Sequence, residues 1–250
     1  TFPLTAENDF LPDLDAIPEE TARRAKFIYI NYPNNPTGAV ATKAFYEKLV
    51  AWAKTYEVGV VSDLAYGALG YQGYENPSFL STPGAKDVGI EFYTFSKTFN
   101  MAGWRLAFAA GNDQMIEALN LIQDHLFVGI FPALQEAGIA ALLDPKSEEA
   151  VAQLNATYDS RRDAFVQAAA KIGWQAFPSR GSFYAWMPVP EGYTSESFAD
   201  LLFEKAHVAV APGKGFGPAG NAYVRIGLLV EPERLVEAVN RIANLQLFNN

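Results

Sequence analysis

Four residues in the first part of the chain have side chains that could take part in one reaction. They are Asn35, Asp63, Tyr66 and Lys97. A lysine amine pushed toward its neutral form by burial and nearby cations attacks carbonyl carbons and forms a Schiff base. A carboxylate facing a pyridine nitrogen keeps that ring protonated, so the ring can withdraw electrons from a reacting carbon. A lysine with an acidic partner therefore indicates pyridoxal 5′-phosphate as a cofactor.

Further donors could hold the remaining parts of such a cofactor. Tyr66 and Asn35 could hydrogen-bond the phenolic oxygen of its ring. Thr94, Ser96 and Arg105 carry hydroxyl and guanidinium donors for its phosphate, and the planar fork of arginine matches phosphate oxygens.

Each of these residues has an ordinary structural explanation when taken alone. Asn35 precedes a proline, and asparagine in such a turn often bonds the neighbouring backbone. Asp63 could cap a helix, Tyr66 could belong to the core, and Lys97 could pair with a carboxylate. The interpretation therefore depends on the combination of residues.

The expected strands explain how residues far apart in sequence could meet. Short runs rich in β-branched and aromatic residues predict buried strands over 26–32, 58–63 and 89–96, followed by a strand over 106–112. Asn35, Asp63 and Lys97 lie at or just beyond the ends of the first three strands. Ligands of open α/β sheets bind outside the carboxyl ends of the strands, so these side chains are expected to face one cleft.

The remaining pattern predicts two domains. Helical spacing of apolar residues predicts helices over 42–57, 113–126, 132–143, 147–173, 194–206 and 231–245. Shorter strands are expected over 182–189, 208–213 and 222–229. The fold class is therefore α/β: a large domain over 1–150 with a mostly parallel central sheet, and a smaller α+β domain over 151–250. The long helix over 147–173 is expected to cross between them.

Composition excludes several other classes of protein. The 250 residues include 19 basic and 28 acidic ones, a net charge of −9, which argues against binding to nucleic acid. There is no cysteine, and His125 and His207 are the only histidines, so neither a disulfide framework nor a metal site is expected. No apolar run has the length of a membrane span and no signal peptide is recognisable. We expect a soluble, cytoplasmic protein, trimmed or part of a longer chain because no initiator methionine is present.

Five segments, in this order, resemble the class I/II aminotransferases of fold type I, which depend on pyridoxal phosphate. They are NYPNNPTG (31–38), SDLAY (62–66), FSKTFNMAGWR (95–105), GSFYAW (181–186) and YVRIGL (223–228). The first and third look most similar to the branch that contains LL-diaminopimelate, alanine and methionine-type transaminases. The resemblance implies transfer of an amino group between an amino acid and a 2-oxo acid.

The resemblance also assigns roles residue by residue. Lys97 matches the lysine that binds the cofactor covalently, with Asp63 at the pyridine nitrogen and Tyr66 with Asn35 at the phenolic oxygen. Lys97, Asp63 and Tyr66 form the catalytic group. Thr94, Ser96 and Arg105 match the phosphate ligands. Arg225, with Asn35 beside it, matches the arginine that binds the substrate α-carboxylate. The alternative for Arg225 is an exposed arginine on an edge strand, although Val224 and Ile226 indicate a strand with one buried face.

The chain departs from the family in two places. Relatives have an upstream part with a glycine-containing turn for the phosphate and an aromatic residue against the ring, and neither is recognisable before Asn35. The segment QDHLFVGIFP (123–132) lacks the arginine of dicarboxylate-specific relatives. If it lines the pocket, it favours a neutral, methionine-like or broad specificity, with glutamate or glutamine as donor; the alternative is that it consists of ordinary helix and core residues. A homodimer is expected. The alternatives are a non-catalytic sensor domain of a regulator and a lyase on the same fold.

Overall fold

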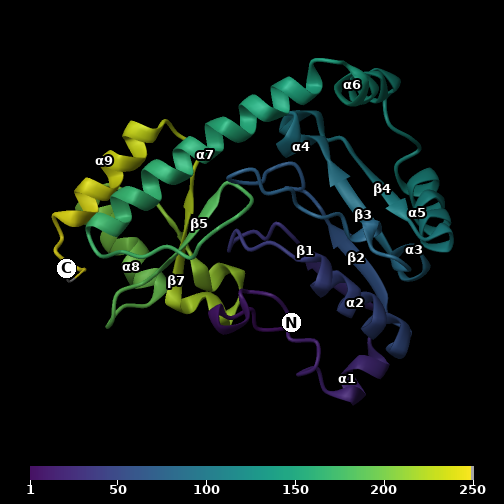
Figure 1. Cartoon of the computed structure of the whole chain (residues 1–250), viewed down its shortest axis with the longest axis horizontal. Coiled ribbons are helices and arrows are strands. Elements are labelled where there is room, and N and C mark those ends of the chain that lie inside the picture. The colour runs from purple at the N-terminus through teal and green to yellow at the C-terminus, as the bar shows by residue number, and fades with distance from the viewer. Residues whose placement is uncertain (249–250) are drawn as a thin grey trace.

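The structure, a computed structural model, describes residues 1–248 and contains a larger and a smaller sheet (Figure 1). The larger sheet has the order β1 (Phe27–Asn31), β2 (Gly59–Asp63), β3 (Gly89–Thr94) and β4 (Ala107–Gly111). The first three strands are parallel and β4 is antiparallel to β3. Asn31 pairs with Asp63, which pairs with Phe92, so the carboxyl ends of these strands lie side by side. The expected mostly parallel sheet is confirmed.

Helix α2 covers one face of this sheet. It runs over Lys43–Tyr56, as its spacing predicts, and begins where the Thr42 hydroxyl accepts a hydrogen bond from the Phe45 N–H at 3.1 Å. Its apolar face, which includes Leu49 and Ala53, is buried together with the inward side chains of β1 and β2. The other helices of this part are α1 (Glu19–Arg24), α3 (Ala85–Val88), α4 (Phe95–Thr98), α5 (Asp113–Leu126) and α6 (Pro132–Leu143).

One of the expected buried strands is open on one face. In β1, Ile28 and Ile30 are 4% exposed, whereas Phe27 and Tyr29 are 61% and 65% exposed. β1 is an edge strand of the sheet. The other edge strand, β4, for which burial was not predicted, has no buried residue, and its Phe108 is exposed. The prediction of fully buried strands was therefore wrong for this face of β1.

The smaller sheet is antiparallel, with the order β5 (Tyr184–Pro188), β7 (Tyr223–Gly227) and β6 (Ala211–Pro212). Helices α7 (Ser147–Lys171), α8 (Ser195–Leu201) and α9 (Pro232–Ala243) pack on it around a core that includes Trp174 and Phe198. The strand expected over 208–213 is reduced to two paired residues. A 3-10 turn begins at Gly213, so the chain leaves the sheet at once.

Helix α7 joins the two parts, as its length predicts, and runs from α6 to the smaller sheet (Figure 1). Asn155 donates to the Ala68 carbonyl at 2.7 Å, and the Tyr158 ring lies 5.3 Å from that of Phe183. Among residues 1–248, no helix has both the length and the apolar character that a membrane crossing needs.

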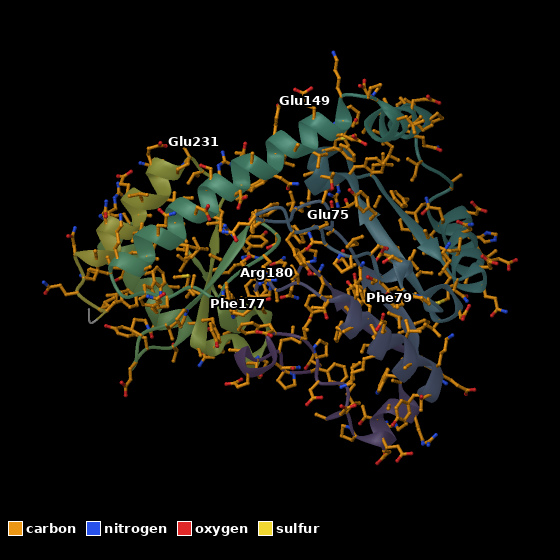
Figure 2. The ribbon with its side chains drawn as sticks, viewed as in Figure 1. Glu75, Phe79, Glu149, Phe177, Arg180 and Glu231 are labelled. Atoms are coloured by element: carbon orange, nitrogen blue, oxygen red, sulfur yellow. The ribbon has the colours of Figure 1, made fainter. Side chains whose placement is uncertain are left out.

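A second connection runs through backbone contacts between the sheets. The N–H of Arg180 donates to the Gly38 carbonyl at 3.3 Å, and the Tyr71 N–H donates to the Arg180 carbonyl at 3.0 Å. Figure 2 shows Arg180 and Phe177 at the centre of the molecule, where the larger part meets the smaller sheet. These hydrogen bonds hold the two parts in direct contact. The division into domains at residue 150 remains a prediction.

Candidate functional site

The turn after β1 is built by asparagine side chains other than the predicted one. Asn34 Oδ1 accepts from the Thr37 N–H at 3.2 Å and from its hydroxyl at 2.8 Å. Asn31 Oδ1 accepts from the Asn35 N–H at 2.9 Å. The side chains of Asn31 and Asn34 therefore make the hydrogen bonds that stabilise this turn. The Asn35 side chain makes none of them and can bond another partner.

Asp63 lies half-buried at the end of β2, where its two carboxylate oxygens have different neighbours. Oδ1 accepts from the Ala65 N–H at 3.1 Å, a local turn contact, and Oδ2 accepts from the Tyr29 hydroxyl at 3.3 Å. The Asn31 side chain donates to the Asp63 carbonyl at 3.0 Å and ties the ends of β1 and β2 together. Asp63 thus makes a turn contact but does not begin a helix.

Lys97 follows β3 in the single turn α4 and lies against aromatic rings. Its Nζ is 5.9 Å from the centroid of the Tyr66 ring and 5.3 Å from that of Phe183. The Tyr66 ring is buried edge-on against Phe183 at 5.2 Å. Burial raises the pKa of the Tyr66 phenol well above its usual range, and Tyr184 and Asp63 add to the rise while Arg225 opposes it. The phenol is therefore a hydrogen-bond donor at neutral pH.

The three predicted phosphate ligands are only partly brought together. Thr94 caps α4: its Oγ1 accepts from the Ser96 N–H at 3.1 Å and donates to the Ser96 hydroxyl at 3.0 Å. The exposed guanidinium of Arg105 instead donates to the Ala102 carbonyl of its own turn, at 3.0 Å. No hydrogen bond joins Arg105 to the other two among the described residues.

Arg225 reaches this edge of the larger sheet from the smaller one. Its Nη1 donates to Asn35 Oδ1 at 2.8 Å, across 190 residues of sequence. Arg225 is half-buried on β7, the central strand, with Val224 and Ile226 buried on the opposite face. The alternative of an exposed arginine on an edge strand is therefore wrong.

The charged residues of this site have no counter-charges of their own. Lys97, Arg105, Arg225 and Asp63 take part in no ion pair within residues 1–248. Lys97 and Arg225 both lie near Tyr66 in a protein with a net charge of −9, and two unpaired cations there favour an anionic ligand. An unpaired carboxylate at the same strand ends suits a cationic or protonated ring nitrogen. These features fit pyridoxal phosphate and a carboxylate substrate.

Sequence reasoning missed three aromatic residues of the site, Phe183, Tyr184 and Phe216. The rings of Tyr184 and Phe216 lie 4.2 and 4.7 Å from the Arg225 guanidinium carbon. Phe183 and Tyr184 belong to the segment GSFYAW, which resembles the family, but no role was predicted for either residue. Phe216 lies in a glycine-rich turn, and no sequence pattern there indicates a functional residue.

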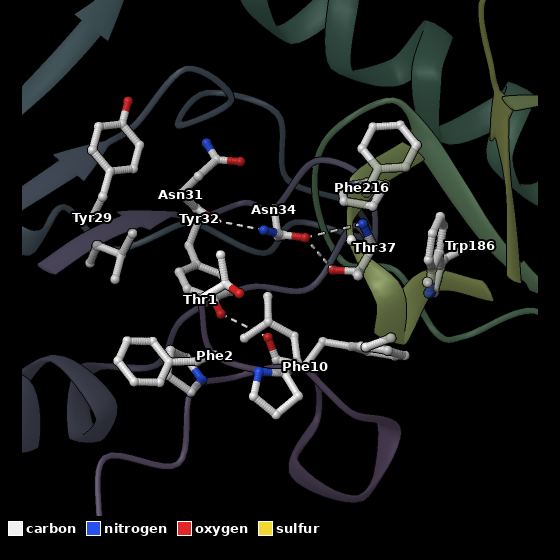
Figure 3. Close-up of a pocket in the computed structure, with 18 of the residues that line it drawn as sticks. Thr1, Phe2, Phe10, Tyr29, Asn31, Tyr32, Asn34, Thr37, Trp186 and Phe216 are labelled. Atoms are coloured by element: carbon white, nitrogen blue, oxygen red, sulfur yellow. Dashed lines mark hydrogen bonds between the residues drawn. The ribbon is translucent and has the colours of Figure 1, made fainter. Parts of the chain in front are cut away.

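A pocket of about 640 Å³ runs along the free edge of β1 (Figure 3). Tyr29 and Asn31 line it from β1, and Phe216 lines it from the smaller part. Asn34 and Thr37, joined by their hydrogen bonds, form part of another wall (Figure 3). Neither Lys97 nor Arg225 lines this pocket, so the pocket is distinct from the positions of these two cations.

Comparison with known proteins decides the family. A family model described as "Aminotransferase class I and II" matches residues 1–242. The chain belongs to this family. Enzymes of the family use pyridoxal 5′-phosphate, and the predicted family, fold class and cofactor are confirmed.

Individual relatives are similar over nearly the whole chain. The L-glutamine–4-(methylsulfanyl)-2-oxobutanoate aminotransferase of Bacillus subtilis is 56% identical over 246 residues, which cover 98% of this chain and 61% of the relative. The LL-diaminopimelate aminotransferase of Moorella thermoacetica is 50% identical over 96% of this chain and 61% of its own length. The structure of apo-BacF from B. subtilis superposes with a TM-score of 0.94 at 45% identity, covering 100% of this chain and 63% of that one. The chain thus spans about three fifths of the length of these aminotransferases.

Proposed function

We propose that the full-length protein containing this chain is a pyridoxal-phosphate-dependent aminotransferase that moves an amino group between an L-amino acid and a 2-oxo acid. One observation carries this proposal: Arg225, from the smaller sheet, donates to Asn35 beside a lysine and a carboxylate that have no ion-pair partners among residues 1–248. This arrangement supplies separate positions for a carboxylate, a carbonyl carbon and a ring nitrogen.

Each residue has a defined part in holding the ligands. Lys97 would bind the cofactor through its amine, and Asp63 would face the ring nitrogen. The Tyr66 hydroxyl and Asn35 would bond the ring oxygen. The phosphate would lie between donors from Thr94, Ser96 and Arg105, and the last of these has to leave its bond to Ala102.

The chemistry follows from these positions. When bound, the cofactor supplies an electron sink that stabilises negative charge on the substrate α-carbon. Arg225 holds the substrate carboxylate and so orients the α-hydrogen toward Lys97. Once the substrate amine has taken its place on the cofactor, the Lys97 amine would be free to accept that proton as a general base and to return a proton as a general acid. The Asp63 carboxylate stabilises positive charge on the ring nitrogen.

Absorption spectroscopy of the full-length protein tests this assignment. Added pyridoxal phosphate is expected to give a visible absorption band that changes when an amino acid is added. In Lys97→Ala the covalent bond is lost, so the band should disappear. A wild-type protein without a band, or a Lys97→Ala protein with an unchanged one, contradicts the proposal.

The substrate is proposed to have a neutral side chain, as in methionine and its keto acid. Phe127, Ile130 and Phe131 are exposed rather than part of the core, and neither lysine nor arginine occurs in 123–132. The relative from B. subtilis named for 4-(methylsulfanyl)-2-oxobutanoate supports this choice, and the LL-diaminopimelate enzymes give the competing one. Turnover should be compared with glutamine plus 4-(methylsulfanyl)-2-oxobutanoate, with LL-diaminopimelate as donor, and with oxaloacetate as acceptor. A preference for LL-diaminopimelate or for oxaloacetate rejects the proposal of a neutral side chain.

We also propose a homodimer. The chain exposes several large apolar side chains on α5 and α6, including Leu126, Ile139 and Leu143. Sedimentation equilibrium of the full-length protein should give twice the mass of one chain, and a monomer would reject the proposal.

A further inference from the structure

The guanidinium group of Arg225 lies close to two aromatic rings. Its central carbon is 4.2 Å from the centroid of the Tyr184 ring and 4.7 Å from that of Phe216. Tyr184 belongs to β5, the strand that pairs with β7, and Phe216 belongs to the turn that follows β6. Asn35 accepts from Nη1 of the same guanidinium at 2.8 Å. Three different elements therefore contact this one group.

These contacts restrict the orientation of a planar group. Stacking of rings on a guanidinium occupies its faces, whereas its N–H donors point outward in its plane. The bond to Asn35 uses one of these donors, and Arg225 has no carboxylate partner within residues 1–248. The remaining in-plane donors have the geometry that binds a carboxylate through two parallel hydrogen bonds.

We propose that Phe216 and Tyr184 are positioning residues that hold the Arg225 guanidinium ready for the substrate carboxylate. The inference rests on the proposed function, in which Arg225 binds that carboxylate. It assigns a binding role to Phe216, a residue that no motif of the sequence marks.

Phe216 is better suited to a test than Tyr184. Its side chain is 42% exposed, so the core does not depend on its burial, and Gly215 and Gly217 flank it in the turn. Besides Arg225, it contacts the Trp186 ring edge-on, with the ring centroids 6.0 Å apart. The Tyr184 ring also contacts Tyr66 at 6.2 Å and Phe183 at 4.9 Å, so its loss would disturb several residues of the site.

The experiment uses the full-length holoenzyme and 2-methylalanine, which carries an α-carboxylate but no α-hydrogen to lose. Its Kd is measured from the change in cofactor absorbance. Phe216→Leu keeps an apolar side chain and removes the ring, so the Kd should rise about two- to fivefold, the usual effect of a partly exposed cation–π contact. Phe216→Tyr keeps the ring and should restore the wild-type Kd. The Kd of 2-methylalaninamide, which lacks the carboxylate, should not change in either variant.

A double-mutant cycle separates this inference from the proposed function. Arg225→Leu should raise the Kd of 2-methylalanine, and adding Phe216→Leu should raise it no further, because Phe216 acts through Arg225. The inference is overturned if Phe216→Leu leaves the Kd unchanged, weakens the amide equally, or acts without Arg225. If Arg225→Leu itself has no effect, the proposed role of Arg225 in the function fails, and the inference fails with it.

Discussion

The side chains of two neighbouring asparagines, Asn34 and Asn35, bond different parts of the protein. Asn34 uses its side chain to close the turn through Thr37, whereas the side chain of Asn35 accepts a hydrogen bond from Arg225. The two residues share the same chemistry and are adjacent in sequence. Only the direction of each side chain separates the structural role of Asn34 from the ligand-binding role proposed for Asn35.

This pair gives a matched test at the scale of the residue. Asn35→Ala removes the acceptor that orients Arg225, so KM for the amino acid should rise about tenfold, the value expected for a hydrogen bond to a charged group. Asn34→Ala should lower the free energy of unfolding by about 1–3 kcal/mol, because it leaves buried turn groups without a partner. Steady-state kinetics and urea denaturation of both variants distinguish the two roles. Equal effects of the two substitutions on KM would contradict the assignment.

At the scale of the element, the turn that ends with Gly38 joins the two sheets. A Cβ at Gly38 would lie 2.1 Å from Ser179 Oγ, and the backbone has a φ of +71°. The Gly38 carbonyl accepts from the N–H groups of Arg180 and Gly181. Glycine is needed here for close approach as well as for its backbone conformation.

Gly38→Ala should therefore lower the free energy of unfolding by more than backbone strain alone would. Gly73 is a suitable control, because its φ is +72° and a Cβ there would meet nothing within 4 Å. Gly73→Ala should lower the free energy of unfolding by about 1 kcal/mol, and Gly38→Ala by about 3 kcal/mol or more, since strain and overpacking add. Urea denaturation measures both values. A Gly38→Ala protein as stable as the Gly73→Ala protein would show that the close contact is unimportant.

The elements of the fold were largely predictable from the order of the residues. The periodicity of α2 and the apolar run of β2 correspond closely to the helix and strand that form. The edge position of β1 and the shortness of β6 were not predictable. Pairing and coverage depend on which strands become neighbours, and local sequence does not contain that information.

At the scale of the molecule, burial of many phenols makes stability depend on pH. Burial raises the pKa of these groups above the ordinary value of 10.0 in Tyr32, Tyr46, Tyr66, Tyr71 and Tyr93. In the unfolded chain they ionise near pH 10.0, while the folded protein keeps their protons. Their stabilising effect is therefore complete below this pH and is lost as the pH rises above it.

The free energy of unfolding should fall steeply above pH 10, by up to about 1.4 kcal/mol per pH unit for each such tyrosine. Urea denaturation across this range, with tyrosinate absorbance as a second signal, checks the prediction. Tyr66→Phe should show a shallower fall than the wild type. Identical slopes for the two proteins would mean that Tyr66 ionises as easily in the fold as in the unfolded chain.

The site was predictable where it consists of residue types at strand ends and less so where it depends on orientation. Asn35, Asp63, Tyr66 and Lys97 were proposed as site residues because parallel strands bring their carboxyl ends to one edge. The hydrogen bond from Arg105 to Ala102 could not be predicted from the sequence. Nor could the position of the Phe216 ring beside Arg225. Rotamers and loop packing decide such contacts, and they have no periodic signal in the sequence.

The sequence by itself determined the family, the fold class and the chemical inventory of the site, because residue type and local pattern set backbone preference and functional groups. The tertiary structure decided which of these groups meet. It placed Arg225 of the smaller sheet against Asn35 of the larger one and turned Asn34 inward to the turn. A contact across 190 residues depends on the packing of two sheets, and only the folded chain specifies that packing.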